Sequence, residues 1–226
     1  MQPYIFPYLG YFQLVNYVDK FIFYDDVNFI KNGWVNRNRL LVNKQVNYIT
    51  IPVKNQSSFL KINEIEFVDY RKKILKTIEY NYCKAAYFDS GFSLVEKVFQ
   101  IDTNKISDLA INSVKLIAEH LEIKTHFEKS SELYSQSINR KREERLYDIC
   151  HQNLAKDYVN LIGGEQLYSK EKFKLNNINL LFILCGDVKY NQGEEMVFHP
   201  NLSIIDVIMH NGKDKTKEFL KNYVIK

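Results

Sequence analysis

Helical and strand patterns alternate along this chain, and that alternation most limits the folds it can adopt. Residues 10–18 carry apolar side chains at helical spacing, and the apolar run Phe21–Tyr24 that follows predicts a buried strand ending in Asp25 and Asp26. The same order returns later as a helix over 142–154, a strand over 158–162, Gly163-Gly164, a helix over 170–175 and a strand over 178–184. This alternation predicts an α/β fold with a mostly parallel, Rossmann-like sheet.

The middle of the chain has a helical pattern. From about residue 70 to residue 121, apolar residues recur at three- and four-residue steps, which predicts two or three helices packed as a cover over the sheet. We expect further strands over 46–53 and 124–127 and a polar loop over 129–137. Because no long linker or repeat divides the 226 residues, we expect a single domain over 1–226 with a helical subregion at about 70–121.

Composition excludes several classes of protein. The net charge of +4 is mild and basic residues are interleaved with acidic ones, so no nucleic-acid partner is expected. Three widely spaced cysteines without a C-x-x-C pair argue against a disulfide scaffold or a zinc site and favour a reducing compartment. No secretory leader is visible, and the longest apolar run, Leu180–Cys185, is too short to span a membrane. We therefore expect a cytoplasmic protein with no metal site.

A dense polar segment follows the first predicted strand. Asp25 and Asp26 stand where ligands bind in α/β sheets, at the carboxyl end of a strand. Arg37 and Arg39 share a face if this segment is extended, so they are predicted to clamp a diphosphate together with Lys31. The alternating Asn36 and Asn38 would then point to the opposite side, and the chain's only tryptophan, Trp34, lies in the same segment. The alternative is a solvated loop with local ion pairs.

The opening loop is the second candidate for a binding site. Its two prolines and Gly10 precede a helix, so backbone N–H groups at the helix N-terminus form a potential anion site. Tyr8-Leu9-Gly10-Tyr11 occupies the position of the His-x-Gly-His motif in nucleotidylyltransferases and class I synthetases. Tyrosine can donate a hydrogen bond to phosphate but brings no positive charge. Gly163-Gly164 allows either a close approach of the backbone to a ligand or a tight turn.

The first forty residues, from Met1 to Leu40, closely resemble the opening signature of the WbqC-like family, which occurs in bacterial O-antigen and other surface-polysaccharide gene clusters. The resemblance continues through Ile162-Gly163-Gly164, Leu167-Tyr168 and Leu202–Asp206, and so covers essentially the whole chain. Family members usually have a few residues of strand before this Met-Gln-Pro, which predicts a late start here. The helix beginning near Arg142 departs from the family's usual glycine-containing entry, so the resemblance assigns no function to Arg145.

The resemblance implies a transferase of surface-polysaccharide synthesis that adds a glycyl or other acyl group to the amine of a nucleotide-linked amino sugar. Its partners would be that sugar and an acyl donor, with ATP or an activated acyl group as co-substrate and no other cofactor identified. Asp25, Asp26 and Lys31 are the predicted catalytic residues. Neighbouring strand residues point to opposite sides, so one of the two aspartates is the base, and the sequence leaves open which one. The predicted substrate-binding residues are Gln2, Tyr4, Tyr8, Gly10, Tyr11, Trp34, Asn36, Arg37, Asn38, Arg39, Gly163 and Gly164.

Two other functions fit the same residues. One is an ATP-dependent ligase that forms an aminoacyl adenylate on a nucleotidylyltransferase-like fold, which the position of Tyr8-Leu9-Gly10-Tyr11 suggests. The other is a sugar-nucleotide-binding or assembly protein without catalytic activity. Pyrophosphate exchange with ATP distinguishes the ligase, and a turnover lost on substitution of Asp25 or Asp26 distinguishes an enzyme from a binding protein.

Overall fold

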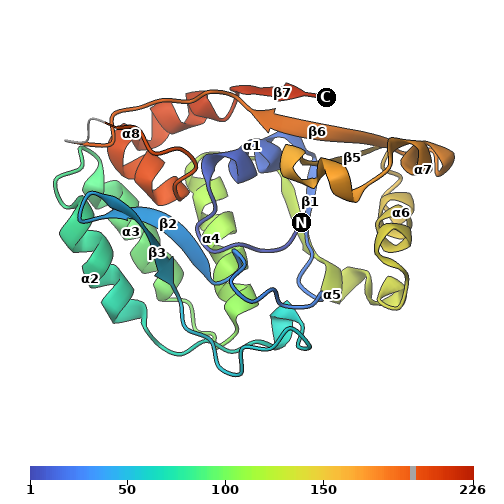
Figure 1. Ribbon diagram of the computed structural model, residues 1–226, viewed down its shortest axis with the longest axis horizontal. Coiled ribbons are helices and arrows are strands. Elements are labelled where there is room, and N and C mark those ends of the chain that lie inside the picture. The colour runs from blue at the N-terminus through green and yellow to red at the C-terminus, as the bar shows by residue number, and fades with distance from the viewer. Residues whose placement is uncertain (194–196) are drawn as a thin grey trace.

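Helices and short strands alternate through the computed structural model, which describes residues 1–193 and 197–226 (Figure 1). The helices are α1 (Leu9–Tyr17), α2 (Arg71–Tyr82), α3 (Phe88–Phe99), α4 (Ile106–His120), α5 (Ser130–Leu133), α6 (Arg142–Gln152), α7 (Lys170–Leu175) and α8 (Ile204–Phe219). The strands are β1 (Lys20–Phe23), β2 (Arg37–Val42), β3 (Gln45–Thr50), β4 (His126–Lys129), β5 (Asp157–Leu161), β6 (Asn179–Cys185) and β7 (Tyr223–Ile225). Short 3-10 helices lie at η1 (Ile62–Glu64), η2 (Ser135–Ser137) and η3 (Ile162–Leu167). The mixed α/β class is confirmed.

The strands of the described residues divide among three small sheets instead of the one Rossmann-like sheet that we expected. β1 pairs with β4 in parallel, β2 pairs with β3 antiparallel, and the third sheet has the order β5-β6-β7. β5 and β6 are parallel, whereas β7 is antiparallel to β6. The β2–β3 pair is antiparallel because its two-residue turn, Asn43-Lys44, has positive φ at both positions, as in tight hairpins. Parallel pairing is thus confined to two strand pairs.

Local patterns located most of the helices and strands. The helix before β1, the three helices of the 70–121 region, and the two helices α6 and α7 occur where the periodicity predicted them. The polar loop expected over 129–137 is wrong, since α5 and η2 form there. The sequence patterns predict no helix or strand after residue 184, whereas the structure has α8 and β7 there. α8 is kinked at Gly212, which has φ +70° and ψ −177°. The apolar residues on the two sides of the kink therefore do not follow one helical periodicity.

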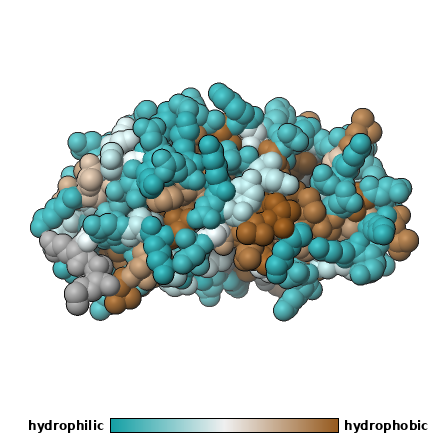
Figure 2. All heavy atoms as spheres, turned by 90° about the horizontal axis from the view of Figure 1, so that it is seen from above, coloured by the Kyte–Doolittle hydropathy of each residue, from teal (hydrophilic) through white to brown (hydrophobic). Residues whose placement is uncertain are grey.

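Two groups of buried apolar side chains hold these elements together. The larger group joins α1 and β1 to the hairpin and to α2, α3, α4 and α8, with Tyr11, Phe12 and Phe23 fully buried. The smaller group packs α6 and α7 against β5 and β6 around Phe173 and Phe182. One face of the surface is mainly hydrophilic, with hydrophobic side chains in limited groups (Figure 2). Among the described residues no helix is both long and apolar enough to cross a membrane.

A buried hydrogen-bond network anchors the start of α8. The Asp206 carboxylate is fully buried and accepts hydrogen bonds from the Tyr82 hydroxyl at 2.8 Å and the Tyr190 hydroxyl at 2.6 Å. The Tyr82 oxygen in turn accepts a hydrogen bond from the backbone N–H of Leu41 at 3.0 Å. Burial raises the pKa of Asp206, and the hydrogen bonds together with nearby His210 partly offset that rise. The network therefore joins α8, α2, β2 and the segment around Tyr190.

Two histidines predict a loss of stability in mild acid. Burial lowers the pKa of both His120 and His210 below 6.5, and Asp206 only partly opposes this at His210. Because the unfolded chain then binds more protons below about pH 6.5, stability is complete above that pH and falls as the pH drops. We expect urea denaturation to give a lower free energy of unfolding at about pH 5 than at about pH 7.5. A His120→Gln/His210→Gln variant should show a smaller fall, and an unchanged pH dependence would contradict this assignment.

Candidate active site

The polar segment after β1 lies at the carboxyl end of that strand, as predicted. β1 runs parallel to β4, and both strands end where α5 begins, since Phe23 pairs with Lys129. Asp25 and Asp26 are only 2% and 4% exposed. Buried carboxylates require hydrogen-bond partners or counter-charges, and the partners decide what each carboxylate can do.

Asp25 is held by the first residues of α5. Its Oδ1 accepts hydrogen bonds from the backbone N–H of Ser131 at 3.0 Å and from the Ser130 hydroxyl at 3.2 Å. Its Oδ2 accepts a hydrogen bond from the Ser131 hydroxyl at 2.7 Å. Asp25 thus joins the end of β1 to α5.

Asp26 forms a buried ion pair with Arg145 of α6. The Asp26 Oδ2 atom lies 2.5 Å from Arg145 Nη2, and the two side chains are 2% and 3% exposed. Asp26 Oδ1 accepts a hydrogen bond from the Ser130 hydroxyl at 2.5 Å. The Ser137 hydroxyl accepts a further hydrogen bond from Arg145 Nε at 3.3 Å. Burial opposes the charge of Arg145, but its contacts with Asp26 and Tyr24 prevail and raise its pKa.

Tyr24 covers the guanidinium of Arg145. The Arg145 Cζ atom lies 4.6 Å from the centre of the Tyr24 ring, within cation–π range. Burial raises the pKa of the Tyr24 phenol, while the charge of Arg145 and its hydrogen bond to the phenol oxygen offset part of that rise. Tyr24 is half-buried, whereas Asp26 and Arg145 lie almost entirely inside the protein. The phenol is therefore the more accessible part of this triad.

Further tyrosines interact with Tyr24: Tyr158 of β5 and Tyr168 do so directly, Tyr4 through Tyr168, and Tyr8 through Tyr4. We call Tyr4, Tyr8, Tyr24, Tyr158 and Tyr168 the tyrosine cluster. Burial is the main cause that raises the pKa of Tyr4, Tyr24 and Tyr158, and Tyr168 raises the pKa of each further. Tyr168 also shares a hydrogen bond with Tyr158. Tyr8 donates a hydrogen bond to the thiol of Cys185, the last residue of β6. Each of the five residues is partly exposed, and a phenol can both donate and accept a hydrogen bond.

Gly163 and Gly164 begin the turn that leads from β5 to Tyr168. A Cβ on Gly163 would have no neighbour within 4 Å, so the space beside it is open. A Cβ on Gly164 would lie 3.1 Å from the Asn160 amide and 3.6 Å from the Tyr168 ring. The two glycines thus border the tyrosine cluster, but only Gly163 faces open space.

The opening loop contributes both cluster members and purely internal residues. Tyr11 is completely buried, and its hydroxyl donates a hydrogen bond to the Gln2 carbonyl at 3.0 Å. The predicted ligand contact of Tyr11 is therefore corrected, because its hydroxyl is directed to the loop backbone. Gly10 is needed for close packing, since a Cβ there would lie 2.2 Å from Cys185 Sγ and 2.5 Å from the Tyr8 ring.

Arg37 and Arg39 lie on one side of β2, and Asn36 and Asn38 are buried on the other, as the alternation predicted. Arg37 Cζ lies 4.4 Å from the Tyr48 ring centre, and Arg39 Cζ lies 5.7 Å from that of Trp34. The Trp34 and Tyr48 rings are 36% and 53% exposed and 6.0 Å apart. We call Trp34, Arg37, Arg39 and Tyr48 the arginine–aromatic face.

Both guanidinium groups of this face contact backbone carbonyls instead of carboxylates. Arg37 donates to the carbonyls of Asn32 and Gly33, and Arg39 donates to the carbonyl of Asn201 at 2.9 Å. In the described part of the chain, Arg37 and Arg39 form no ion pair, and the Nε of Arg39 is buried without a partner. Lys31 is exposed on the neighbouring turn. Within the described residues this positive charge has no counter-ion, which makes the face suited to an anion.

Ser203 links the arginine–aromatic face and the tyrosine cluster through its backbone. The backbone N–H of Ser203 donates to the carbonyl of Arg39 at 2.9 Å, and Ser203 also pairs with Tyr8 in an antiparallel bridge. Asp26, however, takes its guanidinium partner from Arg145 and not from Arg37 or Arg39. The compact sequence segment is thus divided: the carboxylates are buried beside α5 and α6, and the two arginines lie on β2.

Several residues of this site were not predicted from the sequence. They are Tyr24, Tyr48, Ser130, Ser131, Arg145, Tyr158, Tyr168 and Ser203. Arg145 had one recognisable signal, since it lies four residues before Ile149 on the same helix face, where an arginine must find a buried partner. The described residues contain no group of three or more His, Cys, Asp or Glu side chains arranged to hold a metal ion.

Known proteins resemble this chain over nearly its whole length. A curated protein of Mycobacterium tuberculosis (strain ATCC 25618 / H37Rv), named Uncharacterized protein Rv1507c, is 27% identical over 212 residues. The match covers 92% of this chain and 90% of the relative. No solved structure matches the chain significantly. The family model described as WbqC-like protein family matches residues 2–218, which include every residue of the candidate site. The chain therefore belongs to the WbqC-like family.

Proposed function

We propose that this protein transfers an acyl group, glycyl or another aminoacyl group in particular, to the amine of a nucleotide-linked amino sugar. The observation that carries the proposal is the backbone contact of Ser203 with both Arg39 and Tyr8. It joins two arginines that form no ion pair among the described residues to the tyrosine cluster, whose member Tyr24 covers the Asp26–Arg145 pair. The WbqC-like signature supports a role in O-antigen or other surface-polysaccharide synthesis in the cytoplasm.

The arginine–aromatic face suits the nucleotide end of such a substrate. Arg37 and Arg39, with Lys31 beside them, supply positive charge for a diphosphate. The exposed rings of Trp34 and Tyr48 supply flat apolar surface on which a base can stack. The tyrosine cluster then faces the sugar, whose hydroxyl groups both donate and accept hydrogen bonds, as phenols do.

Asp26 is the better candidate for the base that receives the proton of the amine. The single hydroxyl proton of Ser130 lies nearer Asp26, at 2.5 Å, than Asp25, at 3.2 Å, so each carboxylate accepts two full hydrogen bonds. Asp26 is the one whose partner, Arg145, lies under the half-buried Tyr24. In the reaction, the sugar nitrogen forms a bond to the acyl carbon, and the bond from that carbon to the donor's leaving group breaks. The proton lost by the nitrogen passes to the carboxylate and then to the leaving group. In this proposal, Lys31 and the phenol of Tyr24 stabilise the negative charge that develops in the reaction.

The test is an acylation assay read by mass spectrometry. The protein is incubated with a dTDP-linked 4-amino sugar and either an activated glycyl donor or glycine with ATP. We expect the sugar nucleotide to gain the mass of the acyl group, and Asp26→Asn to abolish that gain while the sugar nucleotide still binds. Lys84→Gln, a lysine outside the site, is the matched control and should retain the wild-type rate. No mass gain with any donor would contradict the proposal.

One observation favours a second candidate, a sugar-nucleotide-binding protein without catalytic activity. Both carboxylates are nearly inaccessible and already hydrogen-bonded, as structural aspartates are. In that case Arg37→Gln/Arg39→Gln should abolish binding of the sugar nucleotide, and no acylated product should form with wild-type protein. Pyrophosphate exchange dependent on glycine and ATP would instead indicate the adenylate-forming ligase.

A further inference from the structure

The opening loop contains a backbone conformation that its own residue disfavours. Phe6 has a φ of +43°, in the left-handed region where a bulky side chain is unfavourable. Its side chain is nonetheless buried and packs edge-on against Phe99 at 5.8 Å between ring centres. Such a conformation persists only where surrounding groups hold it, and it is often found at functional sites.

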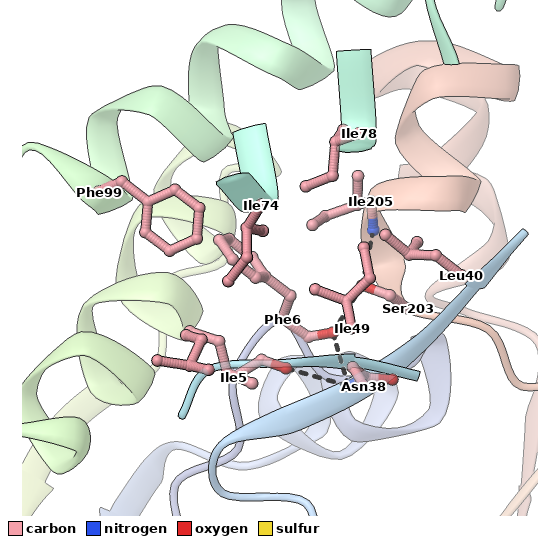
Figure 3. Close-up of a pocket in the computed structure, with 11 residues that line it drawn as sticks. Ile5, Phe6, Asn38, Leu40, Ile49, Ile74, Ile78, Phe99, Ser203 and Ile205 are labelled. Atoms are coloured by element: carbon pink, nitrogen blue, oxygen red, sulfur yellow. Dashed lines mark hydrogen bonds between the residues drawn. The ribbon is translucent and has the colours of Figure 1, made fainter. Parts of the chain in front are cut away.

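Three polar side chains from distant parts of the chain hold this turn (Figure 3 shows two of them). The Asn38 amide of β2 donates to the carbonyl of Ile5 at 3.0 Å and to that of Phe6 at 2.8 Å. The hydroxyl of Ser203, the residue before α8, donates to the Phe6 carbonyl at 2.7 Å. The N–H of Phe6 donates to the Ser113 hydroxyl of α4 at 3.0 Å. Every backbone polar group of Phe6 is therefore fixed by a side chain.

The surroundings of Asn38 and Ser203 are otherwise apolar. The two residues line a small cavity of about 20 Å³ together with isoleucines of α2, β3 and α8 and with Phe99 (Figure 3). Asn38 and Ser203 are 7% and 0% exposed. Apolar residues would pack this space without the desolvation that buried polar groups require. The polar atoms of Asn38 and Ser203 instead bind the loop backbone and accept hydrogen bonds from the N–H groups of Arg39 and Ile205.

The held turn lies between two members of the tyrosine cluster. Tyr4 and Tyr8 flank residues 5–7 and are half-buried, whereas Ile5 and Phe6 point into the core. We infer that Asn38 and Ser203 are positioning residues, which fix the left-handed turn at Phe6 and so place Tyr4 and Tyr8 for contact with the sugar. This inference rests on the proposed function. Asn38 was predicted to bind substrate, and in this account it acts through the loop. Ser203 contributes twice, since it also joins Tyr8 to the arginine–aromatic face.

The phenols of the loop provide a test that needs no substrate. Burial raises the pKa of Tyr4 and of Tyr8 above 10, so neither ionises with exposed tyrosines in the folded protein. Ser203→Ala and Asn38→Leu remove the donors to the Phe6 carbonyl. We expect alkaline absorbance titration of the folded variants to show up to two additional phenols ionising near pH 10. Ser203→Thr keeps the hydroxyl and should titrate as wild type.

A stability control separates positioning from general loosening. Ile78→Val lies on the same cavity but makes no hydrogen bond to the loop, and it should leave the tyrosine titration unchanged. Binding of the dTDP-linked amino sugar, measured well below each variant's melting temperature, should weaken at least tenfold in Ser203→Ala and not in Ile78→Val. Wild-type titration in both Ser203→Ala and Asn38→Leu would overturn the inference. A changed titration with no sugar-nucleotide binding by the wild type supports positioning and overturns the proposed function.

Discussion

Replacing Arg145 by methionine is expected to lower the free energy of unfolding by about 3–5 kcal/mol, because it leaves the buried Asp26 carboxylate without its counter-charge. The pair is almost wholly inside the protein, with its side chains 2% and 3% exposed, so water cannot replace the lost partner. The same substitution also removes the cation over the Tyr24 ring. Urea denaturation of the wild type and the variant at neutral pH measures this loss.

The double variant Asp26→Leu/Arg145→Met is the matched control. It removes both charges, so we expect it to be more stable than Arg145→Met alone, because an apolar pair needs no hydrogen-bond partners. A surface ion pair such as that of Lys189 and Asp187 should contribute little, about 0–1 kcal/mol. A loss below about 1 kcal/mol for Arg145→Met would contradict the buried pair.

Asp206→Ala is expected to lower the free energy of unfolding by roughly 2–6 kcal/mol, since it leaves the hydroxyls of Tyr82 and Tyr190 without their acceptor. Each stranded buried donor costs about 1–3 kcal/mol. The loss should reach beyond α8, because Tyr82 also fixes Leu41 of β2. Amide hydrogen exchange should therefore increase at Leu41 as well as around Tyr190.

Asp206→Asn distinguishes the hydrogen bonds from the charge. The asparagine oxygen can still accept from one or both phenols, and the buried negative charge disappears. We expect this variant to lose much less stability than Asp206→Ala, and its stability should depend less on pH. Equal losses in the two variants would show that the network does not act through its acceptor atoms.

Local periodicity predicted the parts of the fold that depend on neighbours in the sequence. The helix before β1 and the strand that precedes Asp25 and Asp26 follow from spacing alone. The alternation of arginines and asparagines in residues 36–39 also predicted which side of β2 each would face. Such features are local because helix and strand geometry fixes the direction of each side chain.

Long-range pairing explains what the sequence did not reveal. Asp26 and Arg145 are separated by 119 residues, and Asp25 is 106 residues from Ser131. Neither partner has a pattern that points to the other. The division into three sheets has the same origin, because strand pairing depends on how distant segments meet. Phe6 shows the limit most clearly, since its left-handed turn contradicts the preference of phenylalanine and depends on Asn38, Ser113 and Ser203.

A crystal structure with a bound dTDP-linked 4-amino sugar tests the central claim most directly. We expect the diphosphate to lie against Arg37 and Arg39 and the base to stack on Trp34 or Tyr48. The amino sugar should lie among the tyrosine cluster, with its nitrogen directed toward Asp26. Ligand density elsewhere on the protein, with the arginine–aromatic face and the tyrosine cluster both empty, would contradict it.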